Sequence, residues 1–280
     1  MTSLEIQFKR INTKLSSTWR FGWQIIWRIL DWRLFIAPMI TYGIYRYWLH
    51  TAESGRYPKF ILPHPDTVWL RFQEMYADGS LLLHLKVTLR ESLSGLLIAS
   101  VIALVLGYVI ARIRILNYIL IPYLIFLQAI PVVAIAPIII IWVGPDIKSK
   151  IVIAALITWF PLMVSTIVGI RNVSPQLREM MRANVANPLQ VFWHLELPSA
   201  MPEILGGFKI AVTLSVIGAA VGEFISSREG LGYLIVVGRS ISDPASVFLG
   251  VIILTAISLT LYIIVAVIEL FLLRWKRAGS

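Results

Sequence analysis

The chain has 280 residues, of which 58% are hydrophobic and 14% are charged, and its mean hydropathy is +0.80. Soluble domains have about 45–50% apolar and about 25% charged residues, so the composition excludes a soluble globular enzyme and indicates an integral membrane protein. Cysteine is absent, which excludes disulfides and thiolate metal sites, and the four histidines show no metal-ligand spacing. We interpret the formal charge of +10 as lysines and arginines on the cytoplasmic side of a membrane protein rather than as a nucleic-acid-binding surface. We therefore expect no nucleic-acid partner.

Residues 1–33 form a basic lead that we expect to lie on the cytoplasmic side or in the membrane interface. Trp19, Trp23 and Trp27 recur at helical spacing and form one stripe. The stripe predicts an amphipathic helix in the headgroup layer, with arginines facing lipid phosphates. A helix packed on a partner subunit is an equal alternative.

Residues 34–280 are expected to form one transmembrane domain of the all-α class. A helix needs about 20 apolar residues to cross the hydrocarbon core. By this measure the sequence predicts six transmembrane helices, at about 34–50, 91–111, 116–143, 149–170, 203–225 and 247–273. The third is broken by Pro122, Pro131 and Pro137, which is tolerated in a membrane because neighbouring helices can satisfy the freed carbonyls.

Basic residues set the orientation of the spans, because lysine and arginine collect on the cytoplasmic side. They cluster before span one and after spans two, four and six, and with six spans all of these positions fall on one side. We therefore expect both termini in the cytoplasm.

The longest polar segment between spans is a predicted cytoplasmic loop at about 171–202. Ser174 and Asn187 are each followed by proline, the arrangement of an N-cap and a proline at the first helical position. The loop is therefore expected to hold two short helices, at about 175–186 and 188–197.

The second of these helices carries further signals. Gln190 lies three residues after Asn187, close to a capping box, and Pro198 is expected to end the helix. Phe192 and Trp193 make the segment apolar although it lies outside the membrane, which predicts docking to another protein. Packing of both rings under their own bundle is the alternative.

Residues 179–223 resemble the cytoplasmic "EAA" loop and the following helix of permease subunits of binding-protein-dependent ABC importers. The match is close in "LELPSAMPEILGGFKIA". It is weaker before that, where Glu179 holds the acidic position and Val185 replaces the usual glycine. Further segments resemble the nitrate/sulfonate/taurine-type permeases, so the resemblance covers about residues 60–273. These segments are "LPHPDTVW" at 62–69, "HLKVTLRESLSGLLIASVIALVLG" at 84–107, "AIPVVAIAPIIIIWVG" at 129–144 and "GEFISSREGLGYLI" at 222–235.

The resemblance implies a type I ABC importer permease fold with cytoplasmic coupling helices, in the bacterial inner membrane. The implied partners are two ATP-binding subunits, a second permease copy in a homodimer, an external solute-binding protein and membrane lipid. The chain contains no GxxxxGK[ST] segment, so it is not expected to be an enzyme. We expect no cofactor in this chain, and ATP and Mg bound by the partner ATPase, whose closure moves the loop and switches the helices between inward-open and outward-open states.

Three groups of site residues are expected on this basis. The ATPase-coupling group is Glu179, Arg182, Ala183, Ala186, Phe192, Leu195 and Pro198. The translocation path is expected to be lined by polar residues of the middle spans, Gln128, Thr158, Ser165, Thr166, Thr213 and Ser215, although serine and threonine hydroxyls can also bond to their own helix. The external gate or binding-protein contact is Glu223, Arg228 and Glu229. No metal site and no catalytic residue is expected.

Two features of the external group leave alternatives open. Glu223 could cap the following helix, contact the binding protein or line the outer gate, and the structural role is favoured. Ser226 and Glu229 have the spacing of a capping box before a short re-entrant or scoop helix.

In the cytoplasmic loop, Arg178 and Arg182 are expected to pair with acidic residues of the ATPase, or else to mark topology alone.

An ion-coupled secondary carrier or channel, which needs no ATPase, is the main alternative function. It would favour ionisable residues in the middle of the membrane, whereas nearly all charges here lie at span ends. A membrane enzyme would need a catalytic set, and a scaffold would not need the broken third span. The substrate could be nitrate-, sulfonate- or taurine-like, or a pyrimidine- or riboflavin-type vitamin precursor, and the aromatic content slightly favours a neutral or aromatic solute.

Overall fold

The structure of the protein is a computed structural model that describes residues 33–274. Within that range every regular element is helical, as the all-α prediction requires. The chain divides into two compact units, Met1–Pro65 and Asp66–Ser280. The expected interfacial helix with its tryptophan stripe lies outside the described residues.

The described part of the first unit consists of helix α2 (Arg33–Glu53) and the turns that follow it. The Trp48 indole nitrogen donates a hydrogen bond to the Pro63 carbonyl at 3.0 Å, so the segment after the helix folds back on it. The helix matches the first predicted span in position. Its hydropathy is below that of the other spans, and its role as a sixth span stays a prediction.

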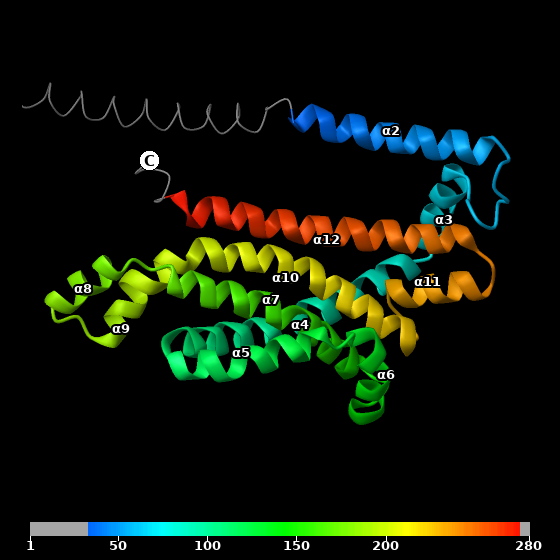
Figure 1. Cartoon of the computed structure of the whole chain (residues 1–280). Helices are drawn as coiled ribbons and strands as arrows, with labels where there is room; N and C mark the ends of the chain where they lie inside the picture. Colours follow the sequence, from blue (N-terminus) through cyan, green and yellow to red (C-terminus); the bar gives the residue numbers. More distant parts are fainter. Residues whose placement is uncertain (1–32, 275–280) are drawn as a thin grey trace, which may run out of the picture. The chain divides into compact units, whose positions relative to one another are not determined.

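The second unit is a helical bundle that carries every other described element (Figure 1). The elements are α3 (Pro65–Ala77), α4 (Ser80–Arg112), α5 (Arg114–Ala129), α6 (Val132–Val143), α7 (Ile147–Arg171), α8 (Pro175–Ala183), α9 (Pro188–Val191), the π-helix η1 (Phe192–Glu196), α10 (Leu197–Ile225), α11 (Leu231–Ser240) and α12 (Pro244–Leu272). Among the described residues four helices are long and apolar enough to cross a membrane, namely α4, α7, the continuous helix from Pro188 to Ile225, and α12.

A fifth span can be formed by α5 and α6 together. The two helices meet at a bend of 91°. Of the three prolines in the predicted span, Pro122 and Pro137 lie inside helices, and the break falls at Pro131. Proline disfavours helical geometry in the residue before it, and Ile130 is accordingly extended.

The core of the bundle is helix α7, which packs closely between α4 and α10. A Cβ atom added to Gly95 of α4 would lie 2.6 Å from the Ala154 Cβ, and one added to Gly218 of α10 would lie 2.6 Å from the Ala154 Cα. The same three helices supply the buried cluster around Ala103, Leu162 and Ala211. Small residues are what allow helix backbones to approach this closely in a membrane.

Helix α3 is tied to the start of α12 by an ion pair. Arg71 lies 2.6 Å from the carboxylate of Asp243, which also caps α12 by accepting hydrogen bonds from the backbone and hydroxyl of Ser246. Burial alone would raise the pKa of Asp243, but the Ser246 hydrogen bonds and the Arg71 charge outweigh it and lower that pKa. The pair therefore persists to a lower pH than an ordinary aspartate would allow.

Replacing Gly218 by alanine is expected to lower the melting temperature of the detergent-solubilised protein. The new methyl group would meet the backbone of Ala154, so the packing penalty of about 1–3 kcal/mol exceeds the helix-propensity gain of about 1 kcal/mol. Gly206→Ala is the matched control in the same helix, because a Cβ atom added at Gly206 would have no other atom within 4 Å. Equal melting temperatures for the two variants would contradict this packing scheme.

Candidate functional site

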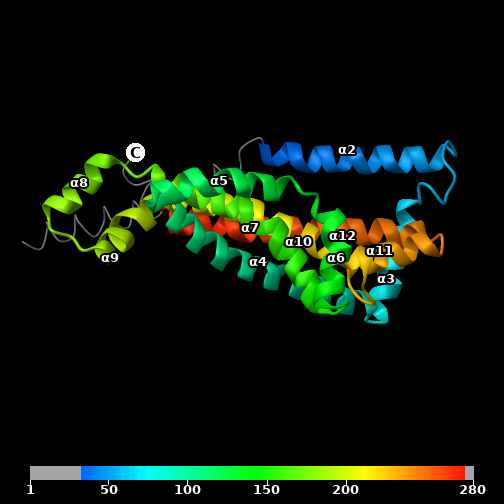
Figure 2. The ribbon, with the colours of Figure 1, turned by 60° about the horizontal axis from the view of Figure 1, so that its bottom comes forward.

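One end of the bundle carries a projecting helical segment between α7 and α10. This segment, called the elbow below, comprises α8, the turn at residues 184–187, α9 and η1. Figures 1 and 2 both show α8 and α9 beyond the ends of α7 and α10, on the side opposite to α11. The elbow is the predicted loop at 171–202.

The start of α9 is capped as the sequence predicts. The Gln190 amide donates to the Asn187 side chain at 2.8 Å, and the Gln190 side chain accepts from the Asn187 amide at 2.9 Å, which completes a capping box. Ser174 is the N-cap of α8 and Pro175 its first residue, but the Ser174 hydroxyl bonds to the Gln176 side chain and not to a helix N–H.

The end of α8 adopts the turn that a glycine usually provides. The Ala186 amide donates to the Met181 carbonyl and the Val185 amide to the Arg182 carbonyl, which is the Schellman pattern of helix termination. Val185 has a φ of +54° and is 89% exposed. The local turn is therefore retained with valine in the left-handed conformation, and α8 ends at Ala183, earlier than the expected 186.

The prediction that Pro198 ends the second loop helix is wrong. The helix runs without interruption from Pro188 through η1 to Ile225. Pro198 has no N–H and cannot donate a helical hydrogen bond. The π-helix before it accommodates this with wider hydrogen bonds, in which the Leu197 backbone amide donates to the Phe192 carbonyl five residues earlier. The elbow is therefore continuous with the core helix α10.

A buried carboxylate joins the elbow to the bundle. Glu196 of η1 is fully buried, and its oxygens lie 3.1 Å from the Arg112 guanidinium and 3.4 Å from that of Arg178. The Tyr108 hydroxyl donates to it at 3.1 Å, and Arg178 also donates to the Ile170 carbonyl at 2.7 Å. Three segments, α4, α8 and η1, thus meet at one carboxylate, and Arg178 joins α7 to them. This group is called the Glu196 clamp below.

The clamp was not predicted from the sequence. Arg178 was expected to meet an ATPase or to mark topology, and in the structure it pairs inside its own chain. The available signal was an acidic residue between two leucines, in "HLELP", near arginines at the ends of two other helices. Nothing in the local spacing links Glu196 to Arg112, because the five helices α5 to α9 lie between them in the chain.

The predicted coupling residues divide between the surface and the interior of the elbow. Glu179, Arg182 and Ala183 are exposed on α8, and Ala186 is half-buried. The other three predicted residues face inward. The Phe192 ring lies 5.0 Å from that of Tyr108, Leu195 is buried, and Pro198 is half-buried. The outward apolar residues of the elbow are Leu177, Met180, Val185, Leu189 and Trp193. Phe192 thus packs on the bundle, as one alternative expects, whereas Trp193 is exposed, and docking to another protein stays a prediction.

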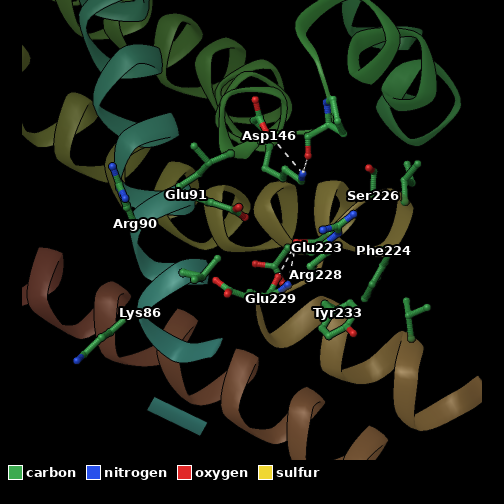
Figure 3. Close-up of a pocket in the computed structure, with 17 residues that line it drawn as sticks. Lys86, Arg90, Glu91, Asp146, Glu223, Phe224, Ser226, Arg228, Glu229 and Tyr233 are labelled. Atoms are coloured by element: carbon green, nitrogen blue, oxygen red, sulfur yellow. Dashed lines mark hydrogen bonds between the residues drawn. The ribbon is translucent and has the colours of Figure 1, made fainter. Parts of the chain in front are cut away.

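The opposite end of the bundle contains a cavity of about 900 Å³ (Figure 3). It lies between the N-terminal parts of α4 and α7, the C-terminal part of α10, and α11. Its charged lining residues are four basic and four acidic side chains, namely Lys86, Arg90, Lys150, Arg228, Glu91, Asp146, Glu223 and Glu229. The predicted external group, Glu223, Arg228 and Glu229, thus meets in one cavity.

Glu223 has the structural role that the sequence favoured. It is 1% exposed, accepts a hydrogen bond from the Thr88 hydroxyl at 2.7 Å, and accepts one from the Gly232 amide in the first turn of α11. The Leu231 amide donates to Thr88 at 2.9 Å. Side chains of α4 and α10 therefore cap α11, as helix N-termini require.

The predicted capping box of Ser226 and Glu229 is wrong. Helix α11 begins at Leu231 with Gly230 as its N-cap, and the Gly230 amide donates to the His84 ring nitrogen at 3.0 Å. Ser227, and not Ser226, makes the local hydrogen bonds with the Glu229 backbone. The glycines let the loop approach Glu223 more closely than a capped polar turn could.

Two further buried charges in the cavity were not predicted. Glu91 is 2% exposed and Lys150 is 3% exposed. The Lys150 ammonium donates to the backbone carbonyls of Pro145 and Asp146, whereas the Glu91 Oε2 atom has no hydrogen-bond partner among residues 33–274. The available signal was a glutamate at the start of an otherwise apolar predicted span.

The predicted path residues are spread over three helices. Thr158, Thr166 and Ser215 are buried, and each hydroxyl donates to a carbonyl of its own helix. Thr213 bonds in the same way to Ile210. Gln128 is exposed next to the break between α5 and α6, and Ser165 lies against Gly207. Their place on a translocation path stays a prediction. In the part of the chain that the structure describes, no group of three or more acidic or histidine residues could hold a metal ion.

An elbow fixed to core helices, on a bundle of apolar spans, defines a multi-pass membrane protein with a helical segment that projects from one end. The family profile described as "Binding-protein-dependent transport system inner membrane component" matches residues 99–275. The chain therefore belongs to the family of permease subunits of binding-protein-dependent ABC importers, which are multi-pass inner-membrane proteins driven by partner ATPases.

Curated relatives include the riboflavin transport system permease protein RibX of Chloroflexus aurantiacus, 38% identical over 267 residues that cover 95% of this chain and 96% of the relative. The formylaminopyrimidine transport permease protein ThiX of Halalkalibacterium halodurans is 33% identical, over 78% of this chain and 87% of its own. The putative aliphatic sulfonates transport permease protein SsuC of Bacillus subtilis is 30% identical, over 92% of this chain and 90% of its own.

Neutralising the Glu196 clamp is expected to loosen the elbow. Glu196→Gln keeps the shape but removes the charge that holds two arginines, at a cost of about 1–3 kcal/mol. Hydrogen–deuterium exchange should become faster across residues 175–196. Glu203→Gln, the same change at an exposed site of α10, serves as the control. Unchanged exchange in the Glu196 variant would show that the clamp does not hold the elbow.

Replacing Val185 by glycine is expected to slow hydrogen–deuterium exchange at the end of α8. A left-handed residue with a side chain costs about 1–2 kcal/mol, and glycine removes that cost while losing about 0.5–1 kcal/mol to chain entropy. Val185→Ala is the matched control, because it shortens the side chain but keeps the Cβ. The strain argument fails if the glycine variant exchanges as fast as the alanine variant.

Proposed function

We propose that the elbow is the surface on which the partner ATPase acts, and that its movement opens and closes the translocation path. The observation that carries the proposal is the combination of a buried clamp and an exposed apolar face in one short segment. A segment that is fixed to the core can transmit displacement, and an exposed apolar face needs a partner to cover it.

The proposed assembly has two permease copies as a homodimer, two ATP-binding subunits on the elbow side and an external solute-binding protein on the cavity side. ATP and Mg are bound by the ATPases, and this chain holds no cofactor. On the elbow, Glu179, Arg182 and Ala183 are exposed and available for the ATPase cleft. Membership of the importer family supports the two kinds of partner, and it gives no support to an ion-coupled carrier or a channel.

In the proposed topology α2 is the first of six spans, both termini are cytoplasmic, and the elbow lies in the cytoplasm. The basic residues of the second unit support this orientation, since Arg112, Arg171 and Arg274 lie at the elbow-side ends of α4, α7 and α12. The cavity then lies on the external side, where Arg228 and Glu229 are exposed and can meet the binding protein. The path residues Gln128, Ser165 and Thr213 keep their proposed role in alternating access.

The proposed substrate is a small organic solute of the kinds that the relatives' names give, which are riboflavin, a formylaminopyrimidine or an aliphatic sulfonate. These names leave the choice between a nitrogen heterocycle and an oxyanion open.

The proposal is tested by Trp193→Ser, with binding of the purified ATPase to nanodisc-embedded permease and ATP-dependent uptake into proteoliposomes as readouts. Trp193 is 57% exposed on the elbow, and loss of an aromatic anchor costs about 2 kcal/mol or more, so ATPase affinity should fall roughly 30-fold and uptake with it.

Trp69→Ser is the matched control for this experiment. Trp69 is 59% exposed on α3, at the other end of the bundle, and its replacement should leave ATPase affinity unchanged. If both variants bind the ATPase as the wild type does, the elbow is not the coupling surface.

A further inference from the structure

We propose that the cavity at the α11 end is a solute-contact site in which Glu91 accepts a hydrogen bond from an N–H group of a nitrogen heterocycle. The inference rests on the proposed transport function and assigns its substrate class. Figure 3 shows the Glu91 and Glu223 side chains reaching into the same space from two neighbouring helices.

Three buried charged side chains line the cavity, and their hydrogen bonding separates their roles. Glu223 has donors on both oxygens, from Thr88 and from the Gly232 amide. Lys150 is occupied by two backbone carbonyls at the start of its own helix. Glu91, at 2% exposure, has its carboxyl group beside that of Glu223, and its Oε2 atom has no hydrogen-bond partner among the described residues. The first two therefore maintain the site, and the third is available to a ligand.

The unpartnered atom sets the chemistry of the ligand. A buried acceptor without a donor costs about 1–3 kcal/mol, so a solute that donates there gains affinity and one that cannot donate does not. Sulfonate, nitrate and similar oxyanions offer only acceptors, and they would also approach the carboxyl groups of both Glu91 and Glu223. Amide, imide and amino N–H groups of a heterocycle fit the oxygen. This oxygen thus discriminates against the sulfonate class.

A simple inorganic cation fits the cavity less well than an N–H donor. Lys150 lies close enough to Glu91 for their charges to interact, so a cation at the carboxylate would also meet the ammonium group. The other basic residues of the lining, Lys86, Arg90 and Arg228, are exposed and stand at its solvent side.

The apolar part of the lining suits a flat ring. Phe224 and Tyr233 both border the cavity, and aromatic faces stack on heterocycles. A volume of about 900 Å³ lies within the usual range of small-molecule sites, roughly 300–1,000 Å³. One acceptor that fixes orientation, beside rings that supply contact area, is the usual composition of such a site.

The test uses the complete transporter, with ATPase and binding protein, reconstituted in proteoliposomes. Riboflavin represents the heterocycles and methanesulfonate the oxyanions. Glu91→Leu removes both acceptor oxygens at similar size, and Glu91→Gln keeps one. Riboflavin uptake by the wild type should exceed that of methanesulfonate, and its kcat/KM should fall at least 10-fold with leucine and less with glutamine. The melting temperature should stay at the wild-type value.

Glu74→Leu is the matched control, because it makes the same replacement at an exposed site of α3 outside the cavity. It should leave riboflavin uptake unchanged. Direct binding is read from riboflavin fluorescence anisotropy with the permease–ATPase complex in nanodiscs, and the Kd should rise with Glu91→Leu in the same proportion as kcat/KM falls.

Several outcomes would overturn the inference. Uptake of methanesulfonate in preference to riboflavin, or of neither probe, would show that the assigned class is wrong. Wild-type riboflavin kinetics in Glu91→Leu would show that a water molecule alone satisfies the Glu91 oxygen. Loss of thermal stability in that variant would show that Glu91 has a structural role. Failure of the coupling proposal is distinct, because it would appear as wild-type ATPase affinity in the Trp193→Ser variant.

Discussion

The close approach of α4 and α10 to α7 is the constraint on which the rest of the structure depends. Gly95 and Gly218 both meet Ala154, so the three helices are in close contact at this residue. In a membrane there is no hydrophobic force between helices, and such close contacts supply the packing instead. Once the helices are held at this distance, their polar residues at both ends are near enough to pair across helices.

The same two helices carry both polar clusters. Helix α4 contributes Glu91 near one end and Arg112 at the other, and the helix that continues into α10 contributes Glu223 and Glu196. At 1.5 Å per residue the cavity and the clamp lie about 30–40 Å apart along these helices. In the proposed coupling, helices of this length, packed on a common third helix, would carry a displacement of the elbow to the walls of the cavity.

Features that depend on one short segment could be predicted from the sequence, whereas features formed by residues far apart in the chain could not. The capping box of Asn187 depends on three neighbouring residues, and the apolar spans on local composition, so both were found. The Glu196 clamp and the unpartnered oxygen of Glu91 depend on which helices become neighbours, which no spacing specifies. Pro198 was misjudged for a related reason, since a π-turn stabilised by packing overrides the local tendency of proline to end a helix.

The two connections of the elbow differ, and the difference decides which helix follows its movement. Toward α10 the connection is an unbroken helix, so rotation of the elbow must tilt α10. Toward α7 the backbone is a short loop, bridged by the bond from Arg178 to the Ile170 carbonyl, while Arg112 links the clamp to α4. Arg112 and Arg178 are each about one-third exposed, so solvent weakens these bridges more than it weakens a helix. Helix α10, with Glu223 at its far end, is therefore the element through which the proposed movement of the elbow would act most directly on the cavity.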